Sequence, residues 1–405
     1  MRLFNNIAEK IIDGWMATLV AQQPPVVVFK NITRQQRSWG ARDRKLFGKG
    51  LYDGIRWYRK YLHACELEMA TDRQAFKKML ICWSLIENIK LPEDIAPDEM
   101  EQKKLLKNIE LNNHFRAIKA SIPDWLDKLG TTYYKTEWDK ECEAFNETAP
   151  LIIRANTLKT TTEALKKRLL EEAQIQTQVV ADIPAALLVE SSKNLTTLEA
   201  YKRGLFEIQD ANSQQIGHFV DPQKNQLLID VCAGAGGKSL HLAALMQNTG
   251  QIIALDKYAA KLERLHARAQ RNGVKNLKIE TNNDAVFYKN HTQKADIVLI
   301  DAPCSGLGVL RRHPEHKWVM NPQRIEDIRH IQQDILVQNA ELVKPHGTLF
   351  YATCSIFPNE NQEQIAAFLK TPIGLQFALD QEKTFLTHQT GHDGFYISKL
   401  TRNRF

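Results

Sequence analysis

The sequence lacks any long apolar run, and this absence limits where the protein can work. Its 405 residues contain no stretch of about eighteen uncharged apolar residues, the length that a membrane-spanning helix needs. The start of the chain carries Arg2, Glu9 and Lys10, with no apolar region and small-residue cleavage site behind them. We therefore expect a cytoplasmic protein with no membrane partner.

Closely spaced cysteine pairs are also missing. The six cysteines lie far apart and none belongs to a C-x-x-C pair, which argues against a zinc finger and against a disulfide framework. We therefore expect reduced thiols and no bound metal. The remaining composition, 43% hydrophobic and 25% charged, is that of a globular protein and excludes fibrous and disordered classes.

A large excess of one charge is absent as well. The net charge of +7 is modest for this length and says little about nucleic acid by itself. Ten lysines and arginines nevertheless lie between residues 30 and 60, among them Arg42, Arg44 and Lys45. Interleaved aromatic residues at partly helical spacing predict helices with an apolar stripe and a positive outer face. That face is either merely solvated or a surface that follows RNA phosphates.

What the chain does contain divides into three parts. Residues 1–145 show helical periodicity and almost no strand-like alternation, which predicts an all-helical domain. Residues 150–215 hold short β-branched runs around the helical segment 162–173, which predicts a small α/β connector. Residues 216–405 alternate apolar runs with helical segments, and we expect them to form a third domain.

The apolar runs of the third part predict its fold. They are short and nearly continuous, each is followed by a helical segment, and most end in Asp or Cys, as in a parallel sheet covered on both faces. In such sheets, chemistry takes place at the carboxyl ends of the strands. The runs are 227–229, 252–255, 277–279, 297–300 and 348–351.

A glycine-rich segment follows the first of these strands. Residues 230–239 read DVCAGAGGKS, and glycines there let the backbone approach a ligand and turn sharply into a helix. A Walker A loop would need Gly at Cys232, and a dinucleotide-binding loop would need Gly at Ser239. Each phosphate-binding pattern therefore misses by one residue.

Acidic residues near the ends of the next two strands suggest a nucleoside. Asp256 suits two ribose hydroxyls, and Asp284 could reach an adenine amino group. A single Asp after a strand is more often a helix cap or turn residue, but acidic residues at several strand ends of one sheet favour a ligand. S-adenosylmethionine is the candidate that has a nucleoside and no phosphates.

Two strand ends carry a cysteine. The fourth strand runs into Asp301-Ala-Pro-Cys304 and the fifth into Thr-Cys354-Ser. A lone cysteine at a strand end is usually a small core residue. Two at corresponding positions suggest that one thiolate attacks carbon 6 of a pyrimidine, so that carbon 5 can take a methyl group, while the other assists. The residues alone do not select which one attacks.

Together these segments resemble the Sun (RsmB/Nop2) family of RNA 5-methylcytosine methyltransferases. The similarity extends to Arg311-Arg-His-Pro with Lys317-Trp318, to residues 204–213, to the closing Asp-Gly-Phe-Tyr at 393–396, and to Arg-x-Asn at 154–156. Residues 42–56 are similar to the NusB-like RNA-binding domain of the bacterial branch. The resemblance implies a class I, Rossmann-like methyltransferase sheet behind the connector and a helical NusB-like domain.

The resemblance also implies roles for individual residues. Cys354 would be the nucleophile, and Cys304 the partner that promotes release of the methylated base. Asp301 would hydrogen-bond the base edge between the cofactor and the cytosine, and Lys238 would help to hold it. Asp256 would lie on the ribose and Asp284 near the adenine. The cofactor loop would comprise Cys232, Ala233, Gly234, Ala235, Gly236, Gly237 and Lys238.

One departure from the family pattern lies in that loop. The family usually writes Ala-Ala-Pro-Gly-Gly-Lys where this chain has Ala233-Gly-Ala-Gly-Gly-Lys238. Losing the proline and gaining a glycine loosens the loop in principle.

The sequence thus predicts a monomeric S-adenosylmethionine-dependent enzyme that methylates carbon 5 of cytidine in RNA. The NusB-like segment favours ribosomal RNA over transfer RNA. A catalytically silent RNA-binding assembly factor is the alternative of another class, and two strand-end thiols argue against it. A nucleotide hydrolase or a dehydrogenase is disfavoured by the two incomplete loop patterns.

Overall fold

The computed structural model describes residues 2–191, 193–281 and 285–403, and the chain separates into two compact units. The first unit comprises Met1–Glu147 with Leu310–Pro322, and the second comprises Thr148–Val309 with Gln323–Phe405. Among the described residues, no helix is both long enough and apolar enough to cross a bilayer.

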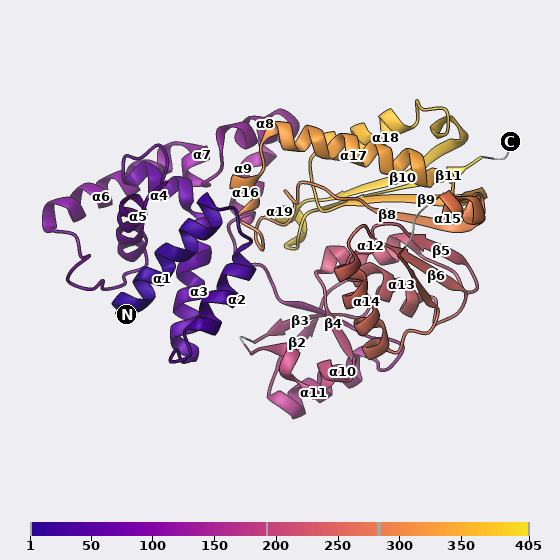
Figure 1. Cartoon of the computed structure of the whole chain (residues 1–405), viewed down its shortest axis with the longest axis horizontal. Helices are drawn as coiled ribbons and strands as arrows, with labels where there is room; N and C mark the ends of the chain where they lie inside the picture. Colours follow the sequence, from indigo (N-terminus) through magenta and orange to yellow (C-terminus); the bar gives the residue numbers. More distant parts are fainter. Residues whose placement is uncertain (1, 192, 282–284, 404–405) are drawn as a thin grey trace. The chain divides into compact units, whose positions relative to one another are not determined.

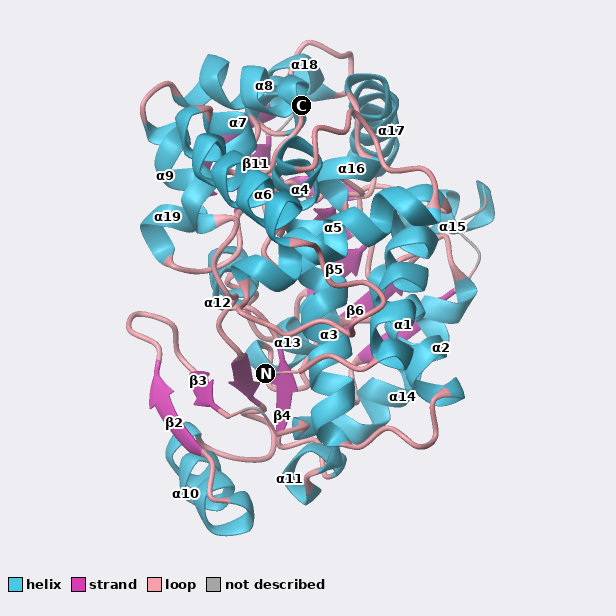
Figure 2. Cartoon of the chain, turned by 90° about the vertical axis from the view of Figure 1, so that its left-hand side faces the viewer, coloured by secondary structure: helices cyan, strands magenta, loops and turns pink. Residues whose placement is uncertain are grey.

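The first unit is helical, as its periodicity predicts, and the described residues 2–147 contain no β-strand (Figure 2). Its core is built around Trp15, which is fully buried and donates from Nε1 to the carbonyl oxygen of Gly50, 3.0 Å away. A Cβ at Gly54 would lie 1.9 Å from the Trp15 ring, so a glycine is needed where these helices cross. The helices are α1 (Asn5–Trp15), α2 (Pro25–Gln35), α3 (Ala41–Arg56), α4 (Tyr58–Ala64), α5 (Arg73–Ile86), α6 (Glu99–Leu111), α7 (Arg116–Lys119), α8 (Asp124–Tyr134), α9 (Glu137–Ala144) and α16 (His316–Val319).

The basic segment 30–60 spans the end of α2, all of α3 and the start of α4, and α3 has the expected division into two faces. Phe47 and Leu51 are fully buried, whereas Arg42, Arg44 and Lys45 are exposed on its first turns. The exposed cations are therefore available to a polyanion.

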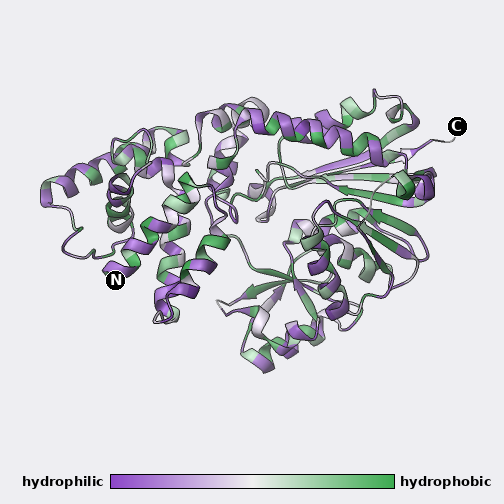
Figure 3. Ribbon diagram, in the orientation of Figure 1, coloured by the Kyte–Doolittle hydropathy of each residue, from purple (hydrophilic) through white to green (hydrophobic). Residues whose placement is uncertain are grey.

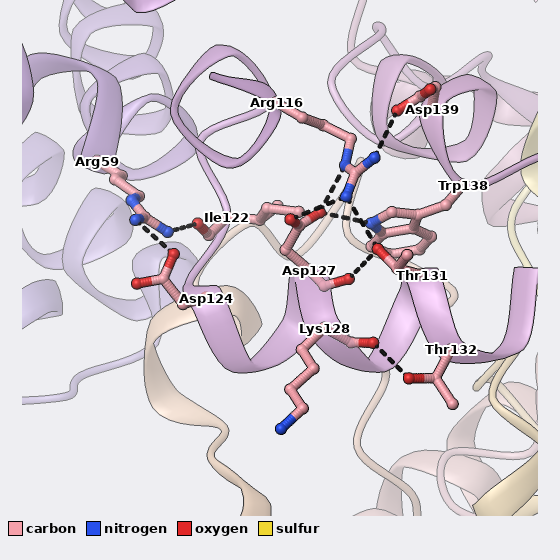
Figure 4. A network of polar contacts seen from close by, with 10 residues as sticks. All are labelled: Arg59, Arg116, Ile122, Asp124, Asp127, Lys128, Thr131, Thr132, Trp138 and Asp139. Atoms are coloured by element: carbon pink, nitrogen blue, oxygen red, sulfur yellow. Dashed lines mark hydrogen bonds and ion pairs between the residues drawn. The ribbon is translucent and has the colours of Figure 1, made fainter. Parts of the chain in front are cut away.

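A network of polar side-chain contacts holds α8 against α7 and α9 (Figure 4). The Arg116 guanidinium donates to both carboxylate oxygens of Asp127, at 2.8 and 3.1 Å, and Trp138 Nε1 donates to the same carboxylate at 2.9 Å. A Cβ at Gly130 would lie 2.1 Å from the Trp138 ring, so α8 and α9 approach closely there. Arg59 binds Asp124 at 2.6 Å at the start of α8.

Residues 310–322 pack with the helices of the first unit, although they lie between two segments of the second. Trp318 Nε1 donates to the carbonyl oxygen of Ile55 at 2.6 Å, and Lys317 Nζ donates to Oδ1 of Asn146 at 2.8 Å. Lys317 is fully buried, and burial, with the nearby Arg56 cation, lowers its pKa well below the ordinary value. The hydrophobic pattern of this segment gave no indication of this placement.

The second unit begins with a four-stranded antiparallel sheet in the order β2-β3-β1-β4. The helix predicted over 162–173 is α10 (Thr162–Ala173), and the expected β-branched runs form the first three strands. The strands are β1 (Ile152–Ala155), β2 (Gln176–Val179), β3 (Ala186–Glu190) and β4 (Phe206–Ile208). Helix α11 (Glu199–Lys202) lies between β3 and β4 in the chain, and α12 (Ala211–Val220) follows β4.

A seven-stranded sheet in the order β10-β11-β9-β8-β5-β6-β7 forms the rest of this unit (Figure 1). Its five parallel strands coincide with the five predicted apolar runs. They are β5 (Leu227–Asp230), β6 (Gln251–Leu255), β7 (Leu277–Glu280), β8 (Ala295–Asp301) and β9 (Val343–Thr353), with β10 (Phe377–Phe385) and β11 (Phe395–Arg402) antiparallel at one edge. The strand order reverses at β5, which is the usual place for a ligand in such a sheet.

Helices cover both faces of this sheet, as expected for a parallel core. On one face, Ile216 of α12 and Leu242 of α13 (Gly237–Leu245) pack on the strands, with α14 (Ala259–Asn272) beside them. On the other face lie α15 (Ala285–His291), α17 (Pro322–Ala340) and α18 (Gln362–Phe368). Figure 3 shows the central strands as hydrophobic and α17 as mixed, which fits a helix with one face toward the sheet.

The antiparallel edge strands were not expected from the sequence. All residues from Ala378 to Lys383 in β10 are exposed, so this strand has no apolar run to signal it. The domain boundaries expected near 145, 150 and 215 stay a prediction.

Candidate active site

The glycine loop turns from β5 into α13 as the sequence suggests. Gly236 has φ +87°, and a Cβ there would lie 2.0 Å from Leu265, so only glycine fits. Above Gly234 and Gly237, by contrast, a Cβ would find no atom within 4 Å. The loop therefore presents bare backbone to an open space in which a ligand can lie close.

Asp256 follows β6 directly and is bound to this loop. Its Oδ2 accepts from the backbone N–H of Gly234 at 2.9 Å, and its Oδ1 accepts from that of Tyr258 at 2.9 Å. The turn role and the ligand role that the sequence leaves open are thus compatible, because each carboxylate oxygen retains a second acceptor site.

The loop is anchored on its other side by Arg268, whose guanidinium donates to the carbonyl oxygen of Ala235 at 2.6 Å. The same arginine pairs with Glu207 at 2.8 Å. These contacts restrain the segment in which the chain departs from the family pattern.

A cavity of about 630 Å³ opens beside the loop at the carboxyl ends of the parallel strands. Of the predicted site residues, Cys232, Gly234, Asp256 and Asp301 line it. Sequence reasoning missed the contribution of α17, because a side chain on a distant helix carries no local signal for a site. Further lining residues are Tyr258, Lys261, Thr281, Tyr288, Ile331, Ile335, Gln338 and Asn339.

Asp230, the last residue of β5, lies behind the loop in full burial. It accepts from the Ser239 hydroxyl at 2.6 Å and so ties the strand end to the first turn of α13. Burial raises the pKa of Asp230 to about 7, with the Asp301 charge adding to the effect and Ser239 opposing it.

Lys238 and Asp301 form an ion pair between α13 and the end of β8. Lys238 Nζ lies 2.6 Å from Oδ2 of Asp301 and 5.2 Å from the centre of the Phe395 ring. Burial lowers the pKa of Lys238, but the Asp301 carboxylate, together with the Cys354 and Asp230 charges, outweighs burial and the net pKa is raised. Lys238 therefore stays charged and is a fixed donor within the site.

The two strand-end cysteines meet. Both are free thiols, their Sγ atoms lie 3.1 Å apart, and the backbone N–H of Cys354 also points to Sγ of Cys304 at 3.3 Å. The hydrogen bond with Cys354, and then burial, raise the pKa of the Cys304 thiol well above its ordinary value. The pair thus resembles a nucleophile with a protonated partner more than two core residues.

The remaining predicted residues lie elsewhere. Asp284 falls outside the described residues. Arg42, Arg44 and Lys45 belong to the helical unit. Sequence reasoning also missed Glu360, a fully buried carboxylate six residues after Cys354, because a lone Glu at the start of a helix ordinarily indicates a cap.

The residues around the cavity fit S-adenosylmethionine. The bare glycine backbone leaves room for a close ligand, and a carboxylate stands at the end of β6. The one cation of the loop, Lys238, is paired with Asp301, and the lysines that line the cavity are Lys257 and Lys261, on the side of Asp256.

Comparisons with known proteins identify the family of the chain. The family model described as 16S rRNA methyltransferase RsmB/F matches residues 218–401, and a model of the RsmF/B-like ferredoxin-like domain matches residues 122–196. A probable ribosomal RNA small subunit methyltransferase B from Synechocystis sp. is 34% identical over 70% of this chain and 67% of its own length. The ribosomal RNA small subunit methyltransferase B of Shewanella oneidensis is 33% identical over 74% of this chain and 72% of its own length.

Solved structures share the fold. The crystal structure of PH0851 is 22% identical and superposes with a TM-score of 0.82 over 99% of both chains. That of NSun6 from Pyrococcus horikoshii with SFG is 21% identical, with a TM-score of 0.63 over 70% of this chain and 99% of that one. The two curated relatives are 34% and 33% identical to this chain over 67% and 72% of their own length. The chain therefore belongs to the RsmB/F family of ribosomal RNA methyltransferases.

Proposed function

We propose that this protein methylates carbon 5 of a cytidine in small-subunit ribosomal RNA, with S-adenosylmethionine as the methyl donor. The observation that carries the proposal is the pair of thiols, 3.1 Å apart, at the ends of the adjacent strands β8 and β9. The Lys238–Asp301 pair stands at the end of β8, and Asp301 also lines the cavity beside the glycine loop. Binding of RNA alone would require neither thiol.

Cys354 is the attacking residue in this proposal. Its thiolate forms a bond to carbon 6 of the cytosine, and the electron pair of the carbon 5–carbon 6 double bond makes carbon 5 nucleophilic. The bound donor supplies a methyl group as an electrophile. The target base has to leave its stack so that its ring can lie between Cys354 and the donor.

Asp301 and Lys238 hold the base edge. The negative charge that develops on the ring during attack is offset by a hydrogen bond or proton that comes from the Lys238 ammonium through Asp301, and this proton returns by the same way when the ring double bond is restored. The ammonium of Lys238, fixed at 2.6 Å, keeps that carboxylate in place. Because Lys238 is buried, charged and already fixed in place, it needs to move little when negative charge develops on the ring.

Cys304 assists removal of the carbon 5 proton. In the free enzyme, its hydrogen bond to Cys354 is the largest cause of its raised pKa. That bond is lost once the Cys354 sulfur is bonded to carbon 6, so Cys304 can then release its own proton to solvent. Its thiolate takes the carbon 5 proton, the electron pair restores the ring double bond, and the carbon–sulfur bond breaks to return the Cys354 thiolate.

The RNA partner follows from the relatives and from the helical unit. The curated relatives are named as small-subunit ribosomal RNA methyltransferases. The exposed cations at the start of α3 supply phosphate contacts outside the catalytic unit.

The proposal is tested by incubating the purified protein with S-adenosylmethionine and small-subunit ribosomal RNA, with transfer RNA in parallel. The RNA is digested to nucleosides and 5-methylcytidine is quantified by mass spectrometry. We expect 5-methylcytidine in ribosomal RNA and none with Cys354→Ala. Methylation of transfer RNA alone would show that transfer RNA, and not ribosomal RNA, is the substrate. RNA binding without any methylation would favour the assembly-factor alternative.

A further inference from the structure

Glu360 lies between the two cysteine-bearing loops with no accessible surface. Its Oε1 accepts from the backbone N–H of Ser305 at 2.8 Å, and its Oε2 accepts from the hydroxyls of Ser305 at 2.5 Å and Ser355 at 2.7 Å. Gln332 Nε2 approaches Oε1 at 3.3 Å. Four donors therefore replace the water that a buried carboxylate loses.

The serines that Glu360 binds are the residues that immediately follow the cysteines. Ser305 follows Cys304 beyond β8, and Ser355 follows Cys354 beyond β9. One carboxylate thus connects the two loops that carry the thiols. A shift of either loop would break at least one of its short hydrogen bonds, so the thiol separation depends on this carboxylate.

Neighbouring side chains hold the same arrangement in place. Asn361 donates from Nδ2 to the carbonyl oxygen of Ser355 at 3.0 Å, and Gln332 donates to that of Pro303 at 3.0 Å. Gln364 of α18 donates to Gln332 Oε1 at 3.1 Å. The network is buried and mutually bonded, which is the condition under which it fixes one geometry.

The charges around the two thiols differ. No ion pair of Glu360 is found in the described part of the chain, and its negative charge, after the Cys354 hydrogen bond and burial, contributes to raising the pKa of Cys304. On the other side, attraction to a Cys354 thiolate is one reason why the pKa of Lys238 is raised. The Glu360 charge therefore acts to raise the pKa of Cys304, whereas the Cys354 charge acts to raise the pKa of Lys238.

We propose that Glu360 is a positioning residue for both cysteines. Its carboxylate holds the two loops at the separation at which the thiols share one proton, and its charge keeps that proton on Cys304. This inference rests on the proposed function for the direction of attack, but the distribution of the proton is a property of the free protein.

The first experiment therefore uses neither RNA nor methyl donor. The reduced full-length protein is treated with iodoacetamide to low conversion between pH 6 and pH 10, and carbamidomethylated Cys304 and Cys354 are quantified in peptides. We expect wild type to react mainly at Cys354. Glu360→Gln keeps the size and an acceptor but removes the charge, so the share of Cys304 should rise several-fold and its pH midpoint should fall, since one pKa unit is tenfold in thiolate population.

Glu363→Gln, an exposed carboxylate on α18, is the matched control and should leave the ratio as in wild type. An unchanged ratio and midpoint in a folded Glu360→Gln protein would overturn the inference. If Glu360→Gln does not fold, as judged by circular dichroism, Ser355→Ala takes its place because it removes one donor and leaves the charge. It should lower Cys354 reactivity and leave Cys304 protected; unaltered reactivity at both thiols would overturn the inference as well.

A second measurement separates this inference from the proposed function. In the methylation assay, Glu360→Gln should lower kcat at least tenfold and leave the KM for RNA within twofold, because Glu360 has no accessible surface with which to contact RNA. If wild type shows no methylation, the proposed function fails while the alkylation ratio still tests Glu360. If wild type is active and Glu360→Gln retains both its kcat and the wild-type alkylation ratio, the role of Glu360 fails alone.

Discussion

The Nζ atom of Lys238 lies 2.6 Å from Oδ2 of Asp301, and this pair joins the first turn of α13 to the end of β8. One interaction thereby fixes a residue of the glycine loop and the residue that we propose contacts the base. The pair is only partly shielded, since the Asp301 side chain is 29% exposed. The ion pair therefore serves to orient the two side chains more than to stabilise the fold.

Lys238→Met should lower the methylation rate on the order of 10²-fold, the usual loss when one preorganised donor is removed from an active site. The measurement is the single-turnover rate at saturating RNA and S-adenosylmethionine. Lys238→Arg keeps the charge and should retain more activity than Lys238→Met. Equal rates for Lys238→Met and wild type would contradict the role of the pair.

The two cysteines should give opposite results when each is replaced by alanine. Cys354→Ala cannot form the bond to carbon 6 and should be inactive without a covalent RNA adduct. Cys304→Ala should still attack and methylate but release the product slowly, so that a denaturing gel shows protein retarded by RNA only when S-adenosylmethionine is present. The double variant should show no adduct. An adduct trapped in Cys354→Ala would exchange the two roles.

Asp256→Ala should weaken S-adenosylmethionine binding by roughly 1.5 to 3 kcal/mol, the range for hydrogen bonds to a charged group. Calorimetric titration measures this. Asp256→Glu should be intermediate because the carboxylate survives with a different reach, and Glu263→Ala, an exposed residue of α14, should bind as wild type does. Unchanged affinity in Asp256→Ala would leave Asp256 as a turn residue that only orders Gly234 and Tyr258.

Replacing Arg42, Arg44 and Lys45 together by Glu should weaken RNA binding and flatten its dependence on salt, because fewer phosphate counterions are released. Filter binding at several salt concentrations measures both. Lys103, Lys104 and Lys107, exposed on α6, allow the same charge change elsewhere in the helical unit as a control. If both triple variants bind RNA as wild type does, the start of α3 is only a solvated face. S-adenosylmethionine affinity should not change in either.

Asp230 should make folding stability depend on pH. Its folded pKa of about 7 exceeds the ordinary value of 3.8, so its proton favours the folded state at low pH, and this contribution is lost as the pH rises from about 4 through 7. Asp230→Asn, which stays neutral and can still accept from Ser239, should lack this loss. Urea unfolding at pH 5 and pH 8 measures the difference, with exposed Asp334→Asn as the control. Parallel curves for wild type and Asp230→Asn would contradict the prediction.

Local sequence pattern was sufficient for most elements that bury an apolar face. The five apolar runs are the five parallel strands, and the segment 162–173 is α10, because periodicity reports directly on which side chains are removed from water. The edge strand β10 was not predicted because its side chains from Ala378 to Lys383 stay in water and therefore show no apolar pattern.

By itself, the sequence determined that Cys304 and Cys354 each follow a strand, and that a glycine loop and Asp256 follow two others. Tertiary structure alone decided that β8 and β9 are neighbours and that the two thiols meet at 3.1 Å. It alone also placed Glu360 on both serines and packed Lys317, which lies in the sequence between two segments of the second unit, among the helices of the first unit. The reason is physical: a strand or helix follows from the side chains within a few residues, whereas a buried carboxylate or ammonium is stable only where donors or acceptors from distant segments converge on it.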